Sequence, residues 1–342
     1  MAQSSVTIPS VSRLSKNVAR ILGQNPGKFT LDGTNTYLVG QSNPYILIDT
    51  GEGLESYIPF LEEALKDRSV PFQANKQDVS DIIVTHKHHD HGGGLPTVLA
   101  LLGRLWKDRE GAGSFVPPRI HKFPLPSQDV KLESILASLQ PGTYTPNGSG
   151  GPTHDLQDGQ TFEITSDSTP PPLLHILHTP GHTEDSICMY LPADRALFTA
   201  DTILGYGTSV FEDLREYMIS LRKMIAFNEG KDEAEQYLTV YPGHGPVVDD
   251  GPKVIAMYLR HRVEREEQLI TFLKQPPPSL SLGYDGVWTV WTLVGTIYKE
   301  YPKELWEPAA HNVHLHLQKL KTDGQVRHLG GTGKDSEWQW IG

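Results

Sequence analysis

The sequence predicts an α/β sandwich, in which two β-sheets lie face to face and helices cover their outer faces. Short apolar runs that end in turn residues recur along the first two thirds of the chain, as expected of buried strands. Helical patterns separate these runs, which is typical of sheets covered by helices. A chain of 342 residues with 37% hydrophobic content can also bury a full-sized core. We therefore expect one large α/β domain with a small appendage.

The expected elements follow these runs in chain order. Strands are predicted at residues 36–39, 45–48, 82–85, 173–177, 187–191, 196–199 and 238–241. Helices are predicted at residues 54–67, 95–108 and 211–226, and from Pro252 to about Lys274. Two stretches rich in Gly, Pro, Ser and Thr, residues 110–118 and 143–158, flank a shorter helix at 130–139. We interpret the segment of about 109–158 as an insertion in a first domain of residues 1–275.

Residues 276–342 predict a small C-terminal module. The run Pro276-Pro277-Pro278 ends the long helix, and two helical patterns follow at residues 288–301 and 305–321. Residues 324–327 and 337–341 then predict a hairpin. Helices followed by a hairpin resemble a winged helix, which often reads DNA, but a fold alone does not fix a function. A packing or lid role is an equal alternative.

Charge and composition exclude several classes of protein. The net charge of −11, from 30 Lys+Arg against 41 Asp+Glu, leaves no broad basic surface for unselective nucleic-acid binding. A local basic patch is still compatible with this net charge. Residues 1–10 lack the pattern of a secretory signal, and no apolar run approaches a membrane span. We expect a cytoplasmic protein with no membrane partner. The single cysteine, Cys188, excludes an internal disulfide and is expected to be buried.

A dense group of histidines and an aspartate follows the strand predicted at 82–85, in the sequence HKHHDHGG of residues 86–93. A histidine-rich surface tract would give the same letters, so this segment alone leaves that alternative open. Three further residues follow apolar strands in the same way, namely His182, Asp201 and His244, and a glycine precedes both histidines. Imidazole nitrogens and carboxylate oxygens are ligands that zinc accepts. The combination predicts a metal site.

In order and type, these motifs resemble the metallo-β-lactamase superfamily. The resemblance rests on the His-x-His-x-Asp-His pattern, the Gly-His of residues 181–182, the isolated aspartate and the Gly-His-Gly of residues 243–245. It implies an αββα metallo-β-lactamase sandwich that binds two Zn²⁺ ions. The implied ligands are His86, His88 and His182 for one ion, Asp90, His91 and His244 for the second, and Asp201 as a bridge between them. His89 occupies a variable position and is not expected to be a ligand.

Three further segments resemble the lactamase-beta-like subgroup over nearly the whole chain. These are NPGKFTLDGTNTYLVG at residues 25–40, LIDTGE at 47–52 and TSVFEDL at 208–214. The subgroup includes an animal mitochondrial endoribonuclease and fungal thioesterases, such as atrochrysone carboxyl ACP thioesterases, which release aromatic polyketides from the acyl carrier domain of a non-reducing polyketide synthase. The resemblance therefore implies a metal-dependent hydrolase in which the ions activate water.

We favour the thioesterase, with an acyl carrier protein domain as partner. The acidic balance and the Pro-rich insertion favour this interpretation. The endoribonuclease is the alternative, and it would need single-stranded RNA guided by basic residues such as Lys253, Arg260, Arg262 or Lys321. A non-catalytic scaffold with a structural metal site is the second alternative, against which all seven expected ligands argue. Asp90 is also the candidate catalytic residue, because its carboxylate can orient the nucleophile.

Other residues near these motifs receive different interpretations. Asp49 is expected to hydrogen-bond a loop of the metal site, a supporting role that metal sites commonly need. His175 and His178 are expected to pack in or beside a strand, and His311, His314 and His316 to lie on a packing or solvated helix face. A Gly-x-Ser-x-Gly elbow does not occur, which disfavours a serine hydrolase. The same ligand set also accepts manganese or iron.

Overall fold

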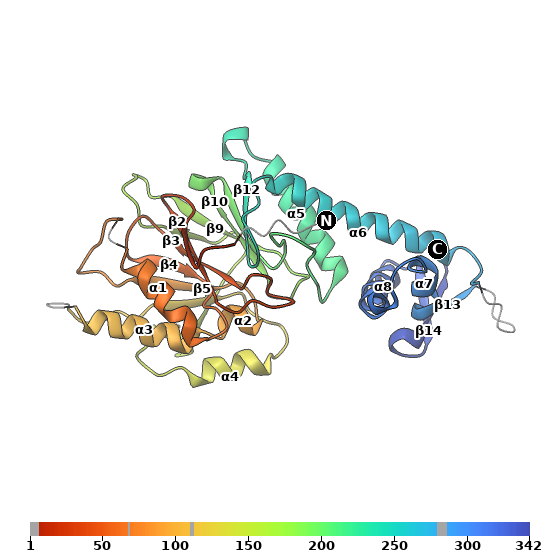
Figure 1. The fold of residues 1–342 in the computed structure, drawn as a ribbon, viewed down its shortest axis with the longest axis horizontal. Coiled ribbons are helices and arrows are strands. Elements are labelled where there is room, and N and C mark those ends of the chain that lie inside the picture. Colours follow the sequence, from red (N-terminus) through yellow and green to blue (C-terminus); the bar gives the residue numbers. More distant parts are fainter. Residues whose placement is uncertain (1–6, 68, 110–112, 279–285) are drawn as a thin grey trace.

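Two β-sheets stacked face to face form the larger part of the molecule (Figure 1). The structure is a computed structural model that describes residues 7–67, 69–109, 113–278 and 286–342. Within these residues the first sheet has the spatial order β1 (Val11–Arg13), β2 (Val18–Leu22), β3 (Asn35–Val39), β4 (Tyr45–Ile48), β5 (Val79–Val84), β6 (Arg119–Lys122) and β7 (Thr153–Asp155). The second sheet has the order β12 (Thr239–Pro242), β11 (Ala196–Ala200), β10 (Ile187–Leu191), β9 (Leu173–His178) and β8 (Thr161–Glu163).

Helices cover the outer face of each sheet. The first sheet carries α1 (Ile58–Leu65), α3 (Leu95–Lys107) and α4 (Val130–Ser138), whereas α5 (Leu214–Glu229) and α6 (Gly251–Leu273) cover the second. Pro occupies the first turn of α1, α3 and α6, where its missing N–H costs no helical hydrogen bond. Helix, sheet, sheet and helix therefore form the four layers that the sequence predicted.

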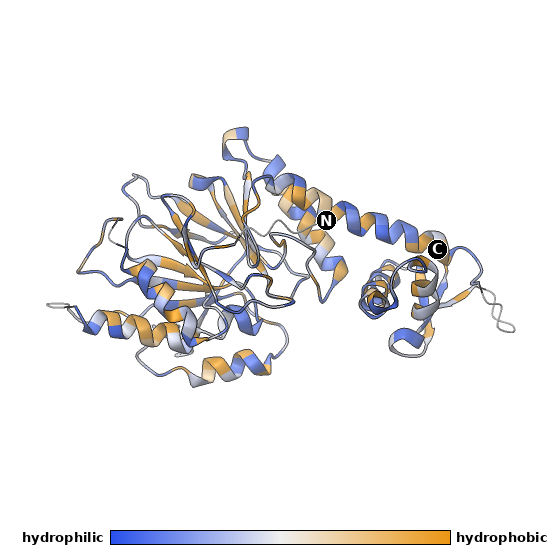
Figure 2. Ribbon diagram, viewed as in Figure 1, coloured by the Kyte–Doolittle hydropathy of each residue, from blue (hydrophilic) through white to orange (hydrophobic). Residues whose placement is uncertain are grey.

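Alternation along the strands builds three separate hydrophobic cores in this sandwich. In β4, Ile46 and Ile48 face the core between the sheets, whereas Leu47 faces the core beneath α1 and α3. In β10, Cys188 faces the core beneath α5 and α6, so its predicted burial is confirmed. Successive strand residues point to opposite faces, and a strand covered on both sides must therefore be apolar throughout. Figure 2 shows this concentration of hydrophobic residues in the stacked strands.

The C-terminal module has a core of its own at the far end of α6. It contains β13 (Val287–Thr289), α7 (Val290–Ile297), α8 (Trp306–Thr322), β14 (Val326–Gly330) and β15 (Glu337–Trp340). The side chains of Trp288, Leu317 and Trp338 are buried in this core together with Leu269 and Leu273 of α6. The helices followed by a hairpin confirm the predicted winged-helix shape. The long charged helix α6 therefore links the sandwich to the module (Figure 1).

Several short strands differ from the prediction. The strands β1, β2, β6, β7, β8 and β13 were not expected, because they are short or contain polar residues such as Arg20 in β2. The segment of about 109–158 contributes α4 and also β6 and β7, which extend the first sheet because β6 pairs in parallel with β5 and β7 in parallel with β6. The first residues of the helix expected at 288–301 lie in β13 instead, and Thr289 caps α7.

Some expectations fall on residues outside the description. These are part of the N-terminal stretch 1–10, part of the segment 109–158 and the stretch after the proline run, because residues 1–6, 110–112 and 279–285 are not described. Among the helices in the described ranges, none is long and apolar enough to cross a membrane.

Candidate metal centre

Loops at one edge of the sandwich bring together the seven residues that the motifs singled out. His86 and His88 follow β5, and the short helix α2 (His89–Gly92) carries Asp90 and His91. The remaining three, His182, Asp201 and His244, follow β9, β11 and β12. Their ligand atoms form two groups, one of His86, His88, His182 and Asp201 and one of Asp90, His91 and His244, and atoms within each group lie within 4.8 Å of one another.

Both glycines that precede the expected histidine ligands are required by their surroundings. Gly181 has a φ of +130°, and a Cβ atom there would collide with the backbone of Tyr217 in α5. At Gly243 a Cβ atom would collide with the Asp201 carboxylate. A residue with a side chain would thus displace a ligand loop in either place.

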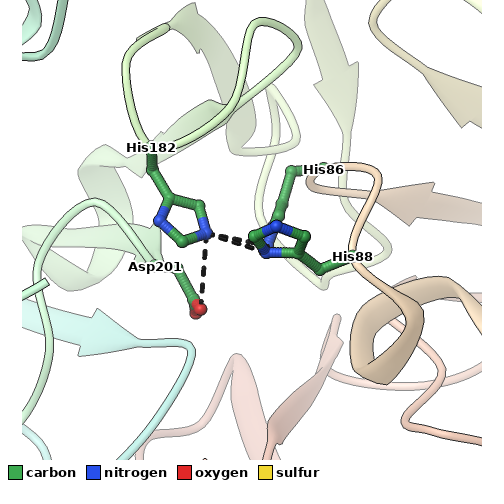
Figure 3. Close-up of side chains that lie close together, drawn as sticks. All are labelled: His86, His88, His182 and Asp201. Atoms are coloured by element: carbon green, nitrogen blue, oxygen red, sulfur yellow. Dashed lines mark hydrogen bonds and ion pairs between the residues drawn. The ribbon is translucent and has the colours of Figure 1, made fainter. Parts of the chain in front are cut away.

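The first group converges on one point (Figure 3). His86 Nε2 lies 3.0 Å from His88 Nδ1. His182 Nε2 lies 3.2 Å from His86 Nε2 and 3.0 Å from His88 Nδ1. The Asp201 Oδ2 atom lies 3.6 Å from His182 Nε2. His86 and His182 are buried, whereas His88 is partly exposed.

The outward-facing nitrogens of this group decide what the inner nitrogens can do. His182 Nδ1 donates to the carbonyl of Val210 at 2.8 Å. His86 Nδ1 donates to the Thr85 hydroxyl at 3.0 Å, because that hydroxyl itself donates to Asp49. A neutral imidazole that donates from one nitrogen presents a lone pair at the other. Two lone pairs therefore face each other across 3.2 Å, an arrangement that a cation bound between them would stabilise.

The second group shows the same construction with carboxylates. His91 Nδ1 donates to Asp49 Oδ2 at 2.7 Å, and His244 Nδ1 lies 3.3 Å from the carbonyl of Gly33. The inner nitrogen of His91 lies 3.3 Å from both Asp90 Oδ2 and Asp201 Oδ1. His244 Nε2 lies 3.3 Å from Asp90 and 3.2 Å from Asp201.

Two buried atoms at the centre, His91 Nε2 and Asp201 Oδ1, have no hydrogen-bond partner among the described residues. Buried polar atoms are normally satisfied, and a metal ion is one of the groups that can satisfy them. The nitrogen and oxygen donors, their convergence and these two orphaned atoms therefore fit one or more divalent cations.

Burial and charge separate the two groups in the ion-free chain. Burial lowers the pKa of His86 well below its usual value and lowers that of His88 to about 4, so both rings are neutral near pH 7. Burial also opposes protonation of His91 and His244, but Asp90 raises the pKa of His91 and Asp201 raises that of His244 to about 9. A cation that binds here must displace these protons.

Asp49 supports both groups without belonging to either. Its carboxylate accepts hydrogen bonds from the backbone N–H and the hydroxyl of Thr85 at 2.8 and 2.9 Å, as well as from His91. The expected hydrogen bonding to the metal-site loop is thus confirmed. Asp49 has a φ of +59°, a conformation that costs free energy and is held by these surroundings.

Sequence reasoning missed the residues that position the candidate ligands. Thr34 donates to Asp90 Oδ2 at 2.9 Å, and the Val210 carbonyl holds His182. Ser209 donates to the carbonyl of Asp201. Thr34 and Val210 lie inside two of the segments that resembled the subgroup, but a hydroxyl or a backbone carbonyl gives no ligand signal in a sequence.

The other histidines lie elsewhere. His89 is exposed, and His178 stacks on Phe123 with the ring centroids 3.8 Å apart. His175 lies against Tyr190 in the second sheet. Among the described residues, the metal-ligand geometry brings together the two groups given above and does not include these histidines.

Comparison with known protein families agrees with this geometry. A model of the metallo-beta-lactamase superfamily matches residues 29–244, and a model of the beta-lactamase associated winged helix domain matches residues 289–338. A "Beta-lactamase-like protein 2 homolog" of Drosophila melanogaster is 35% identical over 326 residues, which cover 94% of this chain and 93% of that protein. The atrochrysone carboxyl ACP thioesterase nsrC of Aspergillus novofumigatus is 31% identical and covers 94% of this chain and 83% of its own.

Solved structures share the fold over nearly the full length. A beta-lactamase domain protein from Burkholderia ambifaria has a TM-score of 0.66 at 16% identity and covers 98% of this chain and 96% of its own. A metallo-beta-lactamase family protein from Thermus thermophilus has a TM-score of 0.57 at 20% identity, with 96% and 100% covered. At such identities the likeness concerns the fold alone.

Proposed function

Because the chain belongs to the metallo-β-lactamase superfamily, whose members are generally hydrolases, we propose that it is a zinc-dependent thioesterase. Its substrate in this proposal is the thioester between an aromatic polyketide and the acyl carrier protein domain of a non-reducing polyketide synthase. The observation that carries the proposal is the convergence of seven buried or half-buried donors in a chain that is 31% identical to a protein named as an ACP thioesterase.

The ligand assignment is part of this proposal. His86, His88 and His182 would hold one Zn²⁺ ion, and Asp90, His91 and His244 a second, with Asp201 shared between them. When bound, zinc supplies a Lewis acid that activates water and polarises a carbonyl oxygen. The fixed outer nitrogens support this assignment, because a ligating histidine normally donates its other N–H to a protein acceptor.

The residues of the chain then orient the reactants. Asp90 is anionic, because His91 and His244 hold its pKa below the usual range although burial opposes this. The Thr34 hydroxyl fixes Asp90 Oδ2, so that the carboxylate can accept a hydrogen bond from the attacking water. The water oxygen adds to the thioester carbonyl carbon, the C–S bond breaks, and the proton lost by water ends on the departing sulfur. A thiolate is a good leaving group, and this step therefore needs no strong acid.

Charge supports the thioester over RNA. The net charge of −11 gives little attraction to a phosphate backbone, whereas a thioester carbonyl is neutral. The side chains of Phe29 and Val210 are 71% and 57% exposed. Phe29 lies on the loop whose Gly33 carbonyl is next to His244, and the Val210 carbonyl accepts from His182, so both side chains offer apolar contact to an acyl group near the candidate metal centre.

We also propose a hydrolase domain of residues 1–275, a C-terminal module of 276–342 and a cytoplasmic location.

A parallel assay of the zinc-loaded chain tests the proposal. The substrates are an aromatic polyketide on its carrier domain, a small aromatic acyl thioester and unstructured RNA, with thiol release and RNA cleavage as readouts. We expect metal-dependent thioester cleavage that His86→Ala abolishes and that His89→Ala, an exposed histidine three residues further along, retains. Cleavage of RNA alone would overturn the proposal in favour of the endoribonuclease.

The scaffold alternative needs a separate variant. We expect Asp201→Ala to abolish hydrolysis while the folded chain persists, since the carboxylate lies among ligands and not in a hydrophobic core. Unfolding of this variant, together with no activity of the wild-type chain on either substrate, would favour a structural metal site.

A further inference from the structure

A polar pocket lies where α6 meets the C-terminal module. It has a volume of about 400 Å³ and is lined by the α6 residues His261, Arg262 and Arg265, by Thr208 of the sandwich and by Tyr298 and Asn312 of the module. Glu264 also lines it, but that side chain is 62% exposed and its carboxylate lies 3.9 Å from Arg260, one turn away on α6. The pocket therefore combines Arg262 and Arg265 with Glu264, whose carboxylate is next to a different cation, Arg260.

Arg262 is the unusual member of this lining. It is 8% exposed, and its Nη2 atom donates to neutral acceptors, the Thr208 hydroxyl at 3.0 Å and the Ser209 carbonyl at 3.3 Å. Its guanidinium lies 4.8 Å from the ring centroid of Phe211, and its buried Nε atom has no hydrogen-bond partner in the part of the chain that the structure describes. A buried cation normally needs a counter-charge, which these neutral contacts do not supply.

Arg265 adds a second, more accessible cation to the same pocket. Its guanidinium lies 4.8 Å from the ring of Tyr298, and Nη1 donates to Gln268 at 2.7 Å. Both contacts hold the guanidinium at the junction but leave its charge unmatched. Two guanidinium groups one turn apart on a helix present a fork-like set of donors that suits a phosphate group.

A three-residue segment connects this pocket to the candidate metal centre. Thr208 lines the pocket, Ser209 donates to the Asp201 carbonyl, and the Val210 carbonyl holds His182. Adjacent Cα atoms are about 3.80 Å apart, so residues 208 and 210 are separated by no more than about 7.6 Å. Thr208, which lines the pocket, thus lies within two residues of the groups that contact the candidate ligands His182 and Asp201.

We propose that this pocket binds the phosphate of the phosphopantetheine arm that joins a thioester to its carrier protein. The inference rests on the proposed thioesterase function and adds the part of the substrate that the α6–module junction recognises. The phosphodiester lies at the far end of the arm from the thioester. Arg262 and Arg265 therefore anchor the arm while its thioester end reaches the candidate metal centre.

The observations favour a single phosphate over an RNA strand. An RNA strand presents a phosphate at every nucleotide and needs a basic track, whereas this pocket is one compact site in a chain of net charge −11. Its two arginines sit on one helical turn instead of following a groove. Asn312 and Tyr298 add neutral donors from the module, which suits the polar amide arm.

Calorimetry tests this assignment. It measures the binding of 4′-phosphopantetheine and of pantetheine to the zinc-loaded full chain. We expect the phosphorylated compound to bind about tenfold more tightly, as one charge-assisted contact provides. Arg265→Gln should remove this preference, and Arg265→Lys should restore part of it. Arg222→Gln, which removes an exposed charge from α5 outside the pocket, is the matched control and should retain the full preference.

Hydrolysis separates this inference from the proposed function. The same acyl thioester is presented on phosphopantetheine and on pantetheine. We expect Arg265→Gln to raise KM for the phosphopantetheine thioester about tenfold and to leave its kcat unchanged. Both constants for the pantetheine thioester should stay unchanged. Equal binding of the two compounds by the wild-type chain would overturn the pocket assignment even if both thioesters are cleaved. Absence of cleavage of either thioester would overturn the thioesterase itself. Loss of RNA binding in Arg265→Gln, without any phosphopantetheine preference in the wild type, would assign the pocket to RNA.

Discussion

Two parts of this chain are rich in histidine, and they use it differently. Around the candidate metal centre, the inner nitrogens of His86 and His182 meet at 3.2 Å, and their outer nitrogens are fixed by protein acceptors. In α8, His311 is exposed, His314 lies 3.1 Å from the Gln318 side chain, and His316 is buried. The difference shows that a high density of histidines is not sufficient for a metal site. What distinguishes the first region is convergence at strand ends together with a protein acceptor behind the rings of His86, His91, His182 and His244.

The largest effect should come from removing a ring that has both properties. His182→Ala removes one inner nitrogen and releases the Val210 carbonyl, and we expect zinc affinity to fall by more than about 100-fold. Equilibrium dialysis with elemental analysis measures this loss. His314→Ala, on the other histidine-rich region, is the control and should leave the metal content unchanged. Equal metal loss in both variants would contradict the distinction.

A smaller loss of zinc affinity is expected on changing Asp49, which accepts from His91 and, through Thr85, supports His86. Asp49→Asn keeps the size of the side chain but places an amide where three donors converge, from Thr85 N–H, Thr85 Oγ1 and His91 Nδ1. Such supporting residues are typically worth about 10–100-fold in metal affinity, and we expect a loss in that range. Asp108→Asn, an exposed carboxylate at the end of α3, provides the matched control. Unchanged zinc affinity in Asp49→Asn would show that the acceptor is dispensable.

Thr34 tests the proposed role of Asp90. Thr34→Val removes the hydroxyl that donates to Asp90 Oδ2, and the carboxylate gains freedom to rotate. We expect kcat for thioester hydrolysis to fall about tenfold, as loss of one hydrogen bond to a charged group does, while zinc content is retained. Steady-state kinetics and metal analysis on the same sample separate these two quantities. A parallel loss of zinc would place Thr34 with Asp49 as support for a ligand.

The sequence predicted the parts of this molecule that depend on local pattern. The runs at residues 45–48 and 187–191 became β4 and β10 with the same bounds, because each is apolar on both faces. The seven candidate ligands were found since each follows a strand. Their assignment to two ions stays a prediction.

Contacts that depend on distant chain segments were not predictable in this way. The strands β6 and β7 carry polar residues and become strands through pairing with β5 and with each other. Thr34 meets Asp90 across 56 positions of sequence, and Arg262 meets Thr208 across 54. No local signal in the sequence marks either pair.

The smallest effect is expected at His316, the buried histidine of α8. Within the described ranges both of its ring nitrogens lack hydrogen-bond partners, and the carboxylate oxygen Glu266 Oε2 lies 3.7 Å from Nδ1. Glu266 is engaged with Lys319 at 2.8 Å. Replacing an unsatisfied polar group by an apolar one of similar size is nearly neutral, so His316→Leu should change the free energy of unfolding by less than about 1 kcal/mol at pH 7.

The free energies of unfolding of the wild-type chain and of His316→Leu should diverge as the pH falls. Burial lowers the pKa of His316 in the folded state, although Glu266 opposes this, so the unfolded chain binds the proton more readily. Wild-type stability from this group is therefore complete above the unfolded pKa of about 6.5 and declines below it, whereas the leucine variant lacks this decline. Urea unfolding of both chains between pH 8 and pH 5 measures the difference. A constant difference across this range would mean that the His316 ring keeps an ordinary pKa, and that burial alone does not separate it from the exposed histidines of the same helix.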